Sequence, residues 1–219
     1  MPLSSPQAIL FDLDGTLADT APDLAGAMNR LRAARGLEPT PYETLRPVAS
    51  AGARGLIGAA FGLKPGDEGY EELRVAFLDN YEQALAVDSR LFDGIPALLD
   101  ALSARGIRWG VVTNKAARFT EPLVPLIGLQ HASCVISGDT TPHAKPHPEP
   151  LFEAARRLQL MPEQCWYVGD DLRDIQAGRA AGMATVAAGW GYCGHVEPAT
   201  WNADELIDKP LDLLELIKR

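Results

Sequence analysis

Short runs of apolar residues, each bounded by turn signals, recur along the chain. They are too short for confident helices, which favours strands that are buried on both faces. Four runs are clear and a fifth is weaker; they cover residues 8–11, 109–112, 134–136, 166–168 and, more weakly, 184–187. Segments with the apolar period of a helix lie between them, at 96–105, 149–158 and 175–181. Alternating strands and helices predict an α/β fold with a Rossmann-like parallel sheet.

The interval from residue 18 to residue 88 departs from this alternation. It contains helical patterns at 23–34, 53–61 and 71–85, but no obvious buried strand. We therefore expect a helical cap at 18–88, inserted into a core made of residues 1–17 and 89–219. The segment 90–94, where the chain returns from the cap, is the expected hinge.

Composition and charge limit the classes of function. The chain has 219 residues, of which 47% are hydrophobic and 22% charged, the balance of an ordinary globular enzyme. A formal net charge of −9 argues against nucleic acid or an anionic membrane as partner. Three widely spaced cysteines indicate neither a disulfide framework nor a zinc site. With no leader pattern and no long apolar stretch, we expect a cytoplasmic monomer or homodimer.

The first apolar run is followed by two carboxylates, in Asp12-Leu13-Asp14-Gly15-Thr16. In a parallel sheet, ligands bind at the carboxyl ends of the strands, so this position favours a functional site. Asp12 is suited to act as nucleophile and metal ligand, while Asp14 is suited to protonate a leaving oxygen and later deprotonate water. The alternative is a strand that ends in an Asp-Gly turn with two solvated carboxylates.

Polar residues also follow the later strands. Thr113 and Asn114 end the second run and can bind phosphate oxygens, although Thr-Asn is also an ordinary strand ending. Lys145 lies in a Pro-rich loop after the third run, where it is either a phosphate ligand or a solvated lysine. Asp170 and Asp174 follow the fourth run and, with Asp12, form an oxygen-ligand set that suits Mg²⁺. Their neighbour Asp171 is better explained as a helix N-cap.

These segments, in this order, resemble the haloacid dehalogenase superfamily over the whole chain. The pieces that carry the resemblance are Asp12-Leu13-Asp14-Gly15-Thr16, the strand end at Thr113, Lys145, and Gly169-Asp170 with Asp174. The resemblance implies a Mg²⁺-dependent phosphatase in which Asp12 forms an aspartyl phosphate. It further implies that the ion is held by Asp12, the backbone carbonyl of Asp14, Asp170 and Asp174, with Thr113 and Lys145 on the phosphoryl group.

The substrate is expected to be a small phosphorylated metabolite. The chain resembles phosphoglycolate phosphatases most, and this is our first interpretation; it also resembles the related N-acetylmuramic acid 6-phosphate phosphatases. A phosphosugar mutase is a further alternative, and a non-catalytic phosphate-binding protein is disfavoured because no motif residue is missing. Arg54 in the cap is the expected ligand of a substrate carboxylate or sugar oxygen, although it is also explained as a solvated side chain. Asn114, Lys115 and Arg118 are expected near the entrance, although Arg118 is equally explained as a first-turn helix residue.

Overall fold

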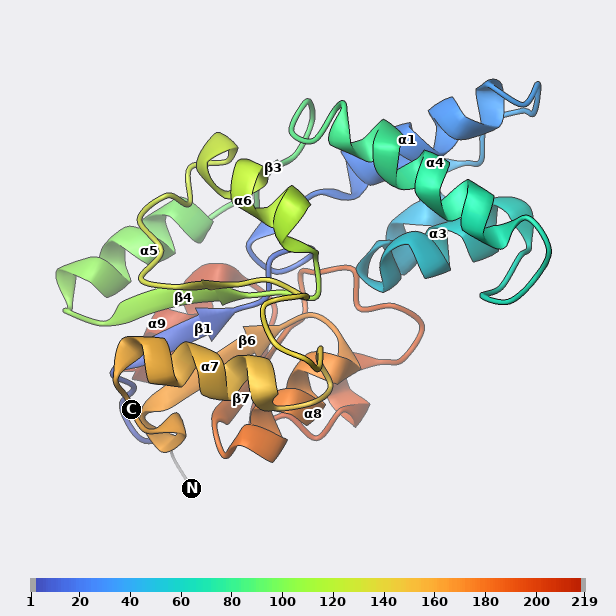
Figure 1. The fold of residues 1–219 in the computed structure, drawn as a ribbon. Helices are drawn as coiled ribbons and strands as arrows, with labels where there is room; N and C mark the ends of the chain where they lie inside the picture. The colour runs from blue at the N-terminus through green and yellow to red at the C-terminus, as the bar shows by residue number, and fades with distance from the viewer. Residues whose placement is uncertain (1–2, 218–219) are drawn as a thin grey trace.

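A computed structural model describes residues 3–217 of the chain. Its main sheet has six parallel strands in the order β5-β4-β1-β6-β7-β8. The strands are β1 (Ala8–Phe11), β4 (Arg108–Val112), β5 (Val135–Ile136), β6 (Cys165–Gly169), β7 (Ala184–Ala188) and β8 (Glu205–Ile207). The chain begins in the middle of the sheet, builds one side and then crosses to the other, so that β4 and β6 flank β1 (Figure 1).

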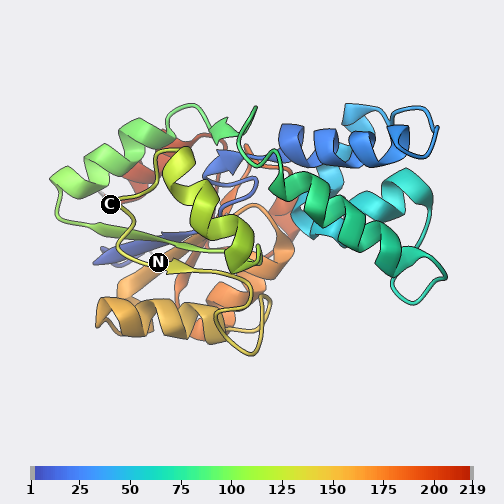
Figure 2. The same cartoon turned by 45° about the horizontal axis from the view of Figure 1, so that its top comes forward.

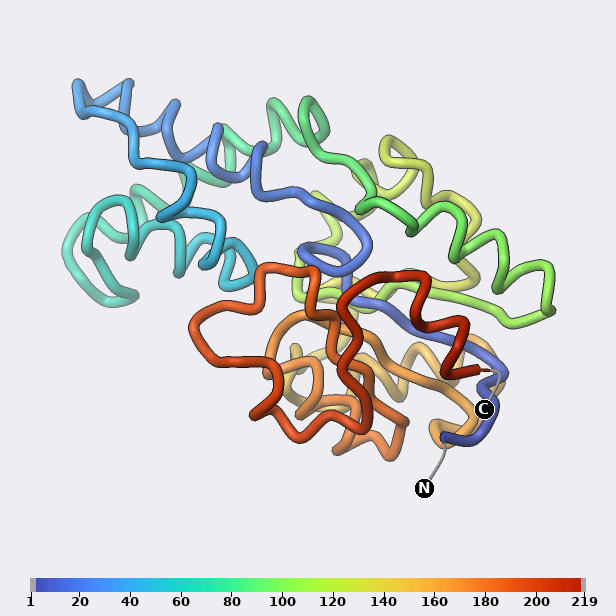
Figure 3. The backbone as a smooth tube through the Cα atoms, turned by 180° about the vertical axis from the view of Figure 1, so that it is seen from behind, coloured from blue at the N-terminus to red at the C-terminus, as the bar shows by residue number. Residues whose placement is uncertain are grey.

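Helices cover both faces of this sheet. Figure 1 shows α5 (Ile95–Ala104) and α6 (Ala117–Leu126) on one face, and α7 (Glu149–Leu158) and α8 (Leu172–Ala181) on the other. Seen from behind, the C-terminal segment with α9 (Leu213–Ile217) runs beside α5 (Figure 3). Strand β1 shows why both layers are needed: Ile9 and Phe11 belong to one apolar cluster and Leu10 to another, all fully buried.

A group of four helices lies beyond the carboxyl ends of the strands (Figures 1 and 2). They are α1 (Ala21–Ala33), α2 (Tyr42–Leu45), α3 (Gly52–Phe61) and α4 (Tyr70–Glu82). Short 3-10 segments occur at Arg46–Ala51, Pro162–Gln164, Pro198–Thr200 and Pro210–Asp212. Buried side chains of α1, α3 and α4 pack together, and we call these four helices the cap.

The chain enters and leaves the cap through a two-stranded antiparallel ribbon. In it β2 (Ala18–Asp19) pairs with β3 (Arg90–Leu91). The buried carboxylate of Asp23, at the start of α1, accepts hydrogen bonds from the backbone N–H groups of Asp88 and Ser89 at 2.8 to 3.1 Å. The two connections are thus fastened to each other, at the segment where the sequence predicts a hinge; the boundaries 18–88 and the hinge itself stay predictions.

The α/β architecture with a parallel sheet and a helical cap confirms the fold expected from the sequence. All five predicted strands are present, whereas the strands β2, β3 and β8 and the helices α2, α6 and α9 were not predicted. Pro122 and Pro125 lie inside α6 and conceal it, because proline usually interrupts a helix. The three cysteines are all free, as expected. Within residues 3–217, no helix combines the length and apolar character needed to cross a membrane.

Candidate active site

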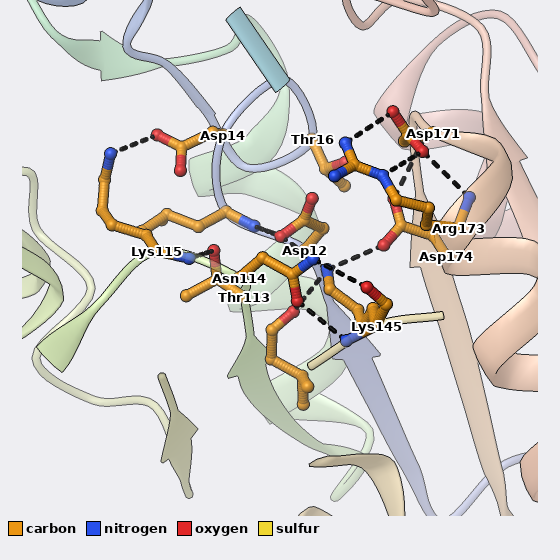
Figure 4. Close-up of polar contacts among 12 residues, drawn as sticks. Asp12, Asp14, Thr16, Thr113, Asn114, Lys115, Lys145, Asp171, Arg173 and Asp174 are labelled. Atoms are coloured by element: carbon orange, nitrogen blue, oxygen red, sulfur yellow. Dashed lines mark hydrogen bonds and ion pairs between the residues drawn. The ribbon is translucent and has the colours of Figure 1, made fainter. Parts of the chain in front are cut away.

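Three neighbouring strands deliver polar side chains to one point. Asp12 follows β1, Thr113 follows β4 and Asp170 follows β6, each directly after the last strand residue. The sheet hydrogen bonding continues through the first two of them: Asp12 donates its N–H to the Val168 carbonyl, and Thr113 to that of Ile136, both at 2.9 Å. Because their backbones are still held by the sheet, these side chains have fixed directions (Figure 4).

Lys145 lies at the centre of this arrangement, with 5% of its surface exposed. Its Nζ is 2.9 Å from Oδ1 of Asp12 and 2.7 Å from Oδ1 of Asp174. It also lies 3.0 Å from the Val112 carbonyl and 2.7 Å from the Tyr167 hydroxyl, which in turn donates to the same carbonyl at 2.8 Å. The ammonium is therefore fully surrounded and sits between two carboxylates of the site (Figure 4).

Asp12, Asp170 and Asp174 form a buried carboxylate cluster. One oxygen of each lies within 4.8 Å of the others, and their exposed fractions are 8%, 0% and 1%. Asp170 is held by Thr16, whose hydroxyl donates to Oδ1 at 2.8 Å, and by the backbone N–H of Tyr192, which donates to Oδ2 at 2.9 Å. The cluster is thus assembled from the ends of β1 and β6 and from the first turn of α8, and Asp170 is held in it by Thr16 and Tyr192.

The cluster leaves no room for larger neighbours. A Cβ added to Gly15 would lie 2.2 Å from Oδ2 of Asp170. A Cβ added to Gly191 would lie 2.2 Å from the Cβ of Asp170. Gly15 also has φ +89, a left-handed conformation that favours glycine. Both backbones approach Asp170 closely because neither carries a side chain.

Burial sets the proton affinity of these carboxyls. It raises the pKa of Asp12 to about 7, opposed by the Lys145 ammonium and reinforced by the charge of Asp174. Burial, followed by the charges of Asp12 and Asp174, also raises the pKa of Asp170 well above its usual range. For Lys145, burial lowers the pKa, but the two carboxylates outweigh it and the pKa is raised.

This donor set fits a hard divalent cation. One ammonium cannot neutralise three buried carboxylates, and oxygen ligands in such a group are those that Mg²⁺ prefers. Asp12, Asp170 and Asp174 are the residues that could hold the ion. The family resemblance also assigns the backbone carbonyl of Asp14 to the ion, and this stays a prediction; the side chain of Asp14 lies outside the cluster.

Asp14 faces another set of partners. Its Oδ1 accepts a short hydrogen bond from the hydroxyl of Thr20 and lies 3.0 Å from Nζ of Lys115 (Figure 4). Asp12 thus belongs to the carboxylate cluster and Asp14 does not, while the separate roles that the sequence predicts for them stay predictions. Lys115, expected only near an entrance, instead forms an ion pair inside the site.

A cavity of about 600 Å³ opens over these residues, between core and cap. Asp12, Asp14, Thr113 and Lys145 line its core side. Its cap side is formed by residues 49–53 and by side chains along α4, including Val75, Leu78 and Tyr81. A molecule bound in it would touch the carboxylate cluster at one end and the cap helices at the other.

Other predicted site residues occupy different positions. Arg54 is exposed on α3 and does not line the cavity, so its role as a substrate ligand stays a prediction. Asn114 lines the cavity, but its amide is hydrogen-bonded to the backbone of Lys145. Asp171 is the N-cap of α8, as expected, and accepts the N–H of Arg173 at 2.9 Å. Arg118 lies at the cavity with its side chain 45% exposed, 3.9 Å from Glu82.

Sequence reasoning missed three contributors. Tyr167 holds Lys145, Arg173 joins core to cap by donating to the Ser50 carbonyl at 2.8 Å, and Tyr81 lines the cavity from α4. Tyr167 lies inside a strand and Arg173 inside a helix. In a sequence, such an aromatic residue is explained by packing and such an arginine by solvation. The spacing of the chain gives no signal for any of the three.

Comparisons with known proteins identify this arrangement. Residues 6–182 match the family model described as haloacid dehalogenase-like hydrolase. The chain belongs to this family. The N-acetylmuramic acid 6-phosphate phosphatase of Pseudomonas aeruginosa is 46% identical over 216 residues, which cover 97% of this chain and 95% of that protein. The phosphoglycolate phosphatase of Xylella fastidiosa strain Temecula1 is 45% identical over 207 residues, with coverage of 94% and 90%.

A solved structure agrees with these relatives. A protein from Haemophilus somnus, described as a predicted phosphoglycolate phosphatase, superposes with a TM-score of 0.84 at 28% identity, covering 97% of this chain and 98% of the other. The expected family and the phosphatase class are therefore confirmed, and this haloacid dehalogenase-like hydrolase is a phosphoric monoester hydrolase. The relatives split between two substrates.

Proposed function

We propose that this hydrolase removes the phosphate of N-acetylmuramic acid 6-phosphate with the help of Mg²⁺. This replaces phosphoglycolate, our first interpretation from the sequence, as the leading substrate. Two relatives carry the muramate name, at 46% and 44% identity. Phosphatases named for phosphoglycolate reach 45% identity, so identity alone separates the two substrates weakly.

The cavity is the observation that supports the larger substrate. Its volume of about 600 Å³ lies in the range that encloses a drug-sized ligand. A two-carbon acid phosphate would leave much of that space to water, whereas a substituted sugar phosphate would fill more of the space between Asp12 and the cap wall near Leu78. A cap that contacts the leaving group can also exclude bulk water from the phosphoryl group.

The chemistry that we propose uses two carboxyl groups in turn. An oxygen of Asp12 attacks phosphorus, a new P–O bond forms, and the bond from phosphorus to the ester oxygen breaks. The proton of Asp14 passes to that ester oxygen, and the alcohol leaves. Water then attacks the aspartyl phosphate, Asp14 takes a proton from it, and the products are inorganic phosphate and free Asp12.

The surroundings of Asp12 support its role as nucleophile. Beside Asp12, Lys145 provides a positive charge and Thr113 provides a hydroxyl group. Both reduce the repulsion between the carboxylate and a phosphate anion. Mg²⁺, bound by Asp12, Asp170 and Asp174, would add to this neutralisation of charge. Asp14 lies outside the carboxylate cluster that contains Asp12, so its carboxyl group is available to serve as acid and base.

A rate comparison tests the proposal. The purified protein is assayed with N-acetylmuramate 6-phosphate, 2-phosphoglycolate and glucose 6-phosphate, each with Mg²⁺ and with chelator. We expect kcat/KM for the muramate to exceed that for both other substrates by ~100-fold or more, and chelator to abolish turnover. A higher kcat/KM for 2-phosphoglycolate would contradict the proposed substrate and restore the sequence-based interpretation. Conversion of glucose 1-phosphate into its isomer without release of phosphate would indicate a mutase.

A further inference from the structure

The hydroxyl of Tyr81 is buried, and its O–H has no hydrogen-bond acceptor. Tyr81 is 1% exposed, and among the described residues its Oη is the one side-chain polar atom that is fully buried and unpaired. Leaving such a group unpaired costs about 1–3 kcal/mol. Since Tyr81 lines the cavity beside the carboxylate cluster, this orphaned hydroxyl indicates a partner that arrives with the substrate.

Lys115 lies next to Tyr81. Its Nζ is 4.7 Å from the centre of the Tyr81 ring and 3.0 Å from Oδ1 of Asp14, and its side chain is 7% exposed. Burial lowers the pKa of Lys115, but Asp14 and Tyr81 outweigh it and raise the pKa, so the ammonium stays charged. Of its three N–H donors, one has the Asp14 carboxylate as acceptor and a second faces Tyr81, which leaves one available to a ligand.

The other cations at the cavity are already occupied. Lys145 is enclosed by its four contacts, and Arg173 is paired with Asp171 at 2.8 Å. Arg74 and Arg118 are 41% and 45% exposed and face glutamates of their own. Lys115 is therefore the buried cation beside Asp14, the group that we expect to meet the leaving oxygen.

The two side chains come from opposite sides of the cavity. Lys115 follows β4 in the core, whereas Tyr81 belongs to α4 of the cap. Tyr81 is held in place by Phe119 of α6, with ring centres 5.4 Å apart, and by Phe77, at 6.4 Å. Aromatic packing on both sides fixes the ring, so its hydroxyl cannot turn away to reach solvent.

We propose that Lys115 and Tyr81 form a subsite for the carboxylate of the substrate. One carboxylate oxygen accepts an N–H of Lys115, and the other accepts the O–H of Tyr81, which gains the partner it lacks. This inference rests on the proposed hydrolysis of a carboxylate-bearing phosphomonoester. Because Lys115 belongs to the core and Tyr81 to the cap, a substrate whose carboxylate binds this subsite would also hold the cap over the phosphoryl group.

Matched substrates isolate the carboxylate. N-acetylglucosamine 6-phosphate equals N-acetylmuramate 6-phosphate without the lactyl ether that carries the acid, and ethyl phosphate plays the same part for 2-phosphoglycolate. The readout is the ratio of kcat/KM within each pair. A general loss of activity, such as one caused by removing the partner of Asp14, cancels in this ratio.

In the parent protein we expect the acid to be preferred in at least one pair. Lys115→Met and Tyr81→Phe should each lower that preference, by ~10-fold or more for Lys115→Met, since a charged hydrogen bond is lost. Tyr81→Phe should also raise Tm, by about 2–4 °C for each kcal/mol gained, because it removes an unpaired polar group. Controls are Lys64→Met, an exposed lysine of a cap loop, and Tyr70→Phe, a buried tyrosine of α4 away from the cavity.

The outcomes separate the two proposals. If the parent prefers the acid in the phosphoglycolate pair only and Lys115→Met removes that preference, the muramate substrate is wrong and the subsite stands. Retention of the acid preference by both variants, or no acid preference in the parent, overturns the subsite. Loss of preference in Lys64→Met or Tyr70→Phe to the same degree would also overturn it, because the effect would not be specific to these two side chains.

Discussion

The side-chain amide of Asn114 holds the backbone of Lys145 through both of its polar atoms. Oδ1 accepts the N–H of Lys145 and Nδ2 donates to its carbonyl, each at 2.9 Å. A residue expected to contact substrate thus anchors the loop that carries the central cation. Its geometry nearly repeats that of Asn29 in the cap, which binds the N–H of Thr40 at 2.8 Å and its carbonyl at 3.0 Å.

The pair Asn114 and Asn29 gives a controlled prediction. Asn114→Ala and Asn29→Ala should each destabilise the protein by about 1–2 kcal/mol, because each loses two hydrogen bonds. Only Asn114→Ala should also lower kcat, by ~10-fold or more, because Lys145 loses its position. Urea unfolding and steady-state kinetics check this. Equal effects of both variants on kcat would show that stability alone matters.

Asp12→Asn should leave a folded but inactive protein. The amide cannot form an acyl phosphate bond with release of the ester, so we expect kcat to fall by at least about 1,000-fold. Circular dichroism and Tm would verify the fold. Activity above about a tenth of the parent value would refute the covalent step.

Removal of one carboxylate should weaken the metal site. Asp170→Asn keeps the size of the side chain and loses its charge, so the affinity for Mg²⁺ should fall by ~10-fold or more. Asp171→Asn is the matched control, since asparagine caps a helix about as well as aspartate. Titration calorimetry measures both. If Asp171→Asn weakens Mg²⁺ binding as much as Asp170→Asn does, the ion is bound through general negative charge rather than by the cluster.

Stability without metal should depend on pH through Asp12. The pKa of this carboxyl is raised from 3.8 to about 7, so the folded chain keeps a proton that the unfolded chain releases between these values. The contribution of Asp12 to the free energy of unfolding of the metal-free protein should therefore be largest below about pH 4. This contribution should decrease as the pH rises and be lost as the pH passes through about 7. Asp12→Asn should flatten that dependence in urea unfolding with chelator present.

Mg²⁺ should counteract this loss, because it binds the deprotonated carboxylates. We expect its affinity to increase from pH 5 to pH 8 and its binding to release protons, measurable by calorimetry in buffers of different ionisation enthalpy. A constant affinity over this range would contradict the raised pKa of Asp12.

Gly15→Ala tests how closely the first loop approaches Asp170. The new Cβ would lie 2.2 Å from Oδ2, so Asp170 must move and Mg²⁺ affinity should fall. Gly36→Ala has a comparable positive φ, +69, with nothing within 4 Å. It should cost about 1 kcal/mol of stability and leave Mg²⁺ binding as in the parent.

The sequence could predict the centre of the site because its residues follow directly from strand ends. Asp12, Thr113 and Asp170 come from three apolar runs, and parallel strands must place their carboxyl ends together. It could not predict the pairing of Lys115 with Asp14, because a lysine three positions after a strand is equally suited to solvent. The partners of Tyr81 depend on how the cap is placed over the core, which no local pattern records.

The same reasoning explains the elements that were missed. The apolar period that reveals α7 is interrupted in α6 by Pro122 and Pro125. Strand β8 has a partly exposed, mixed sequence at the edge of the sheet, so it lacks the continuous apolar run that marks β1. Strands buried on both faces can be predicted from their continuous apolar sequence. An edge strand lacks this signal, and its position depends on the strand with which it pairs.

The ribbon of β2 and β3 has a consequence for how this protein can change. Residues 19 and 90 pair directly, so the chain leaves the core and returns to it at neighbouring points. An insertion of any size between them leaves the spacing of the parallel strands as it is. The four helices can therefore be lengthened, exchanged for another lid or replaced by a tight turn, and the phosphoryl chemistry can be inherited while the choice of substrate is rewritten.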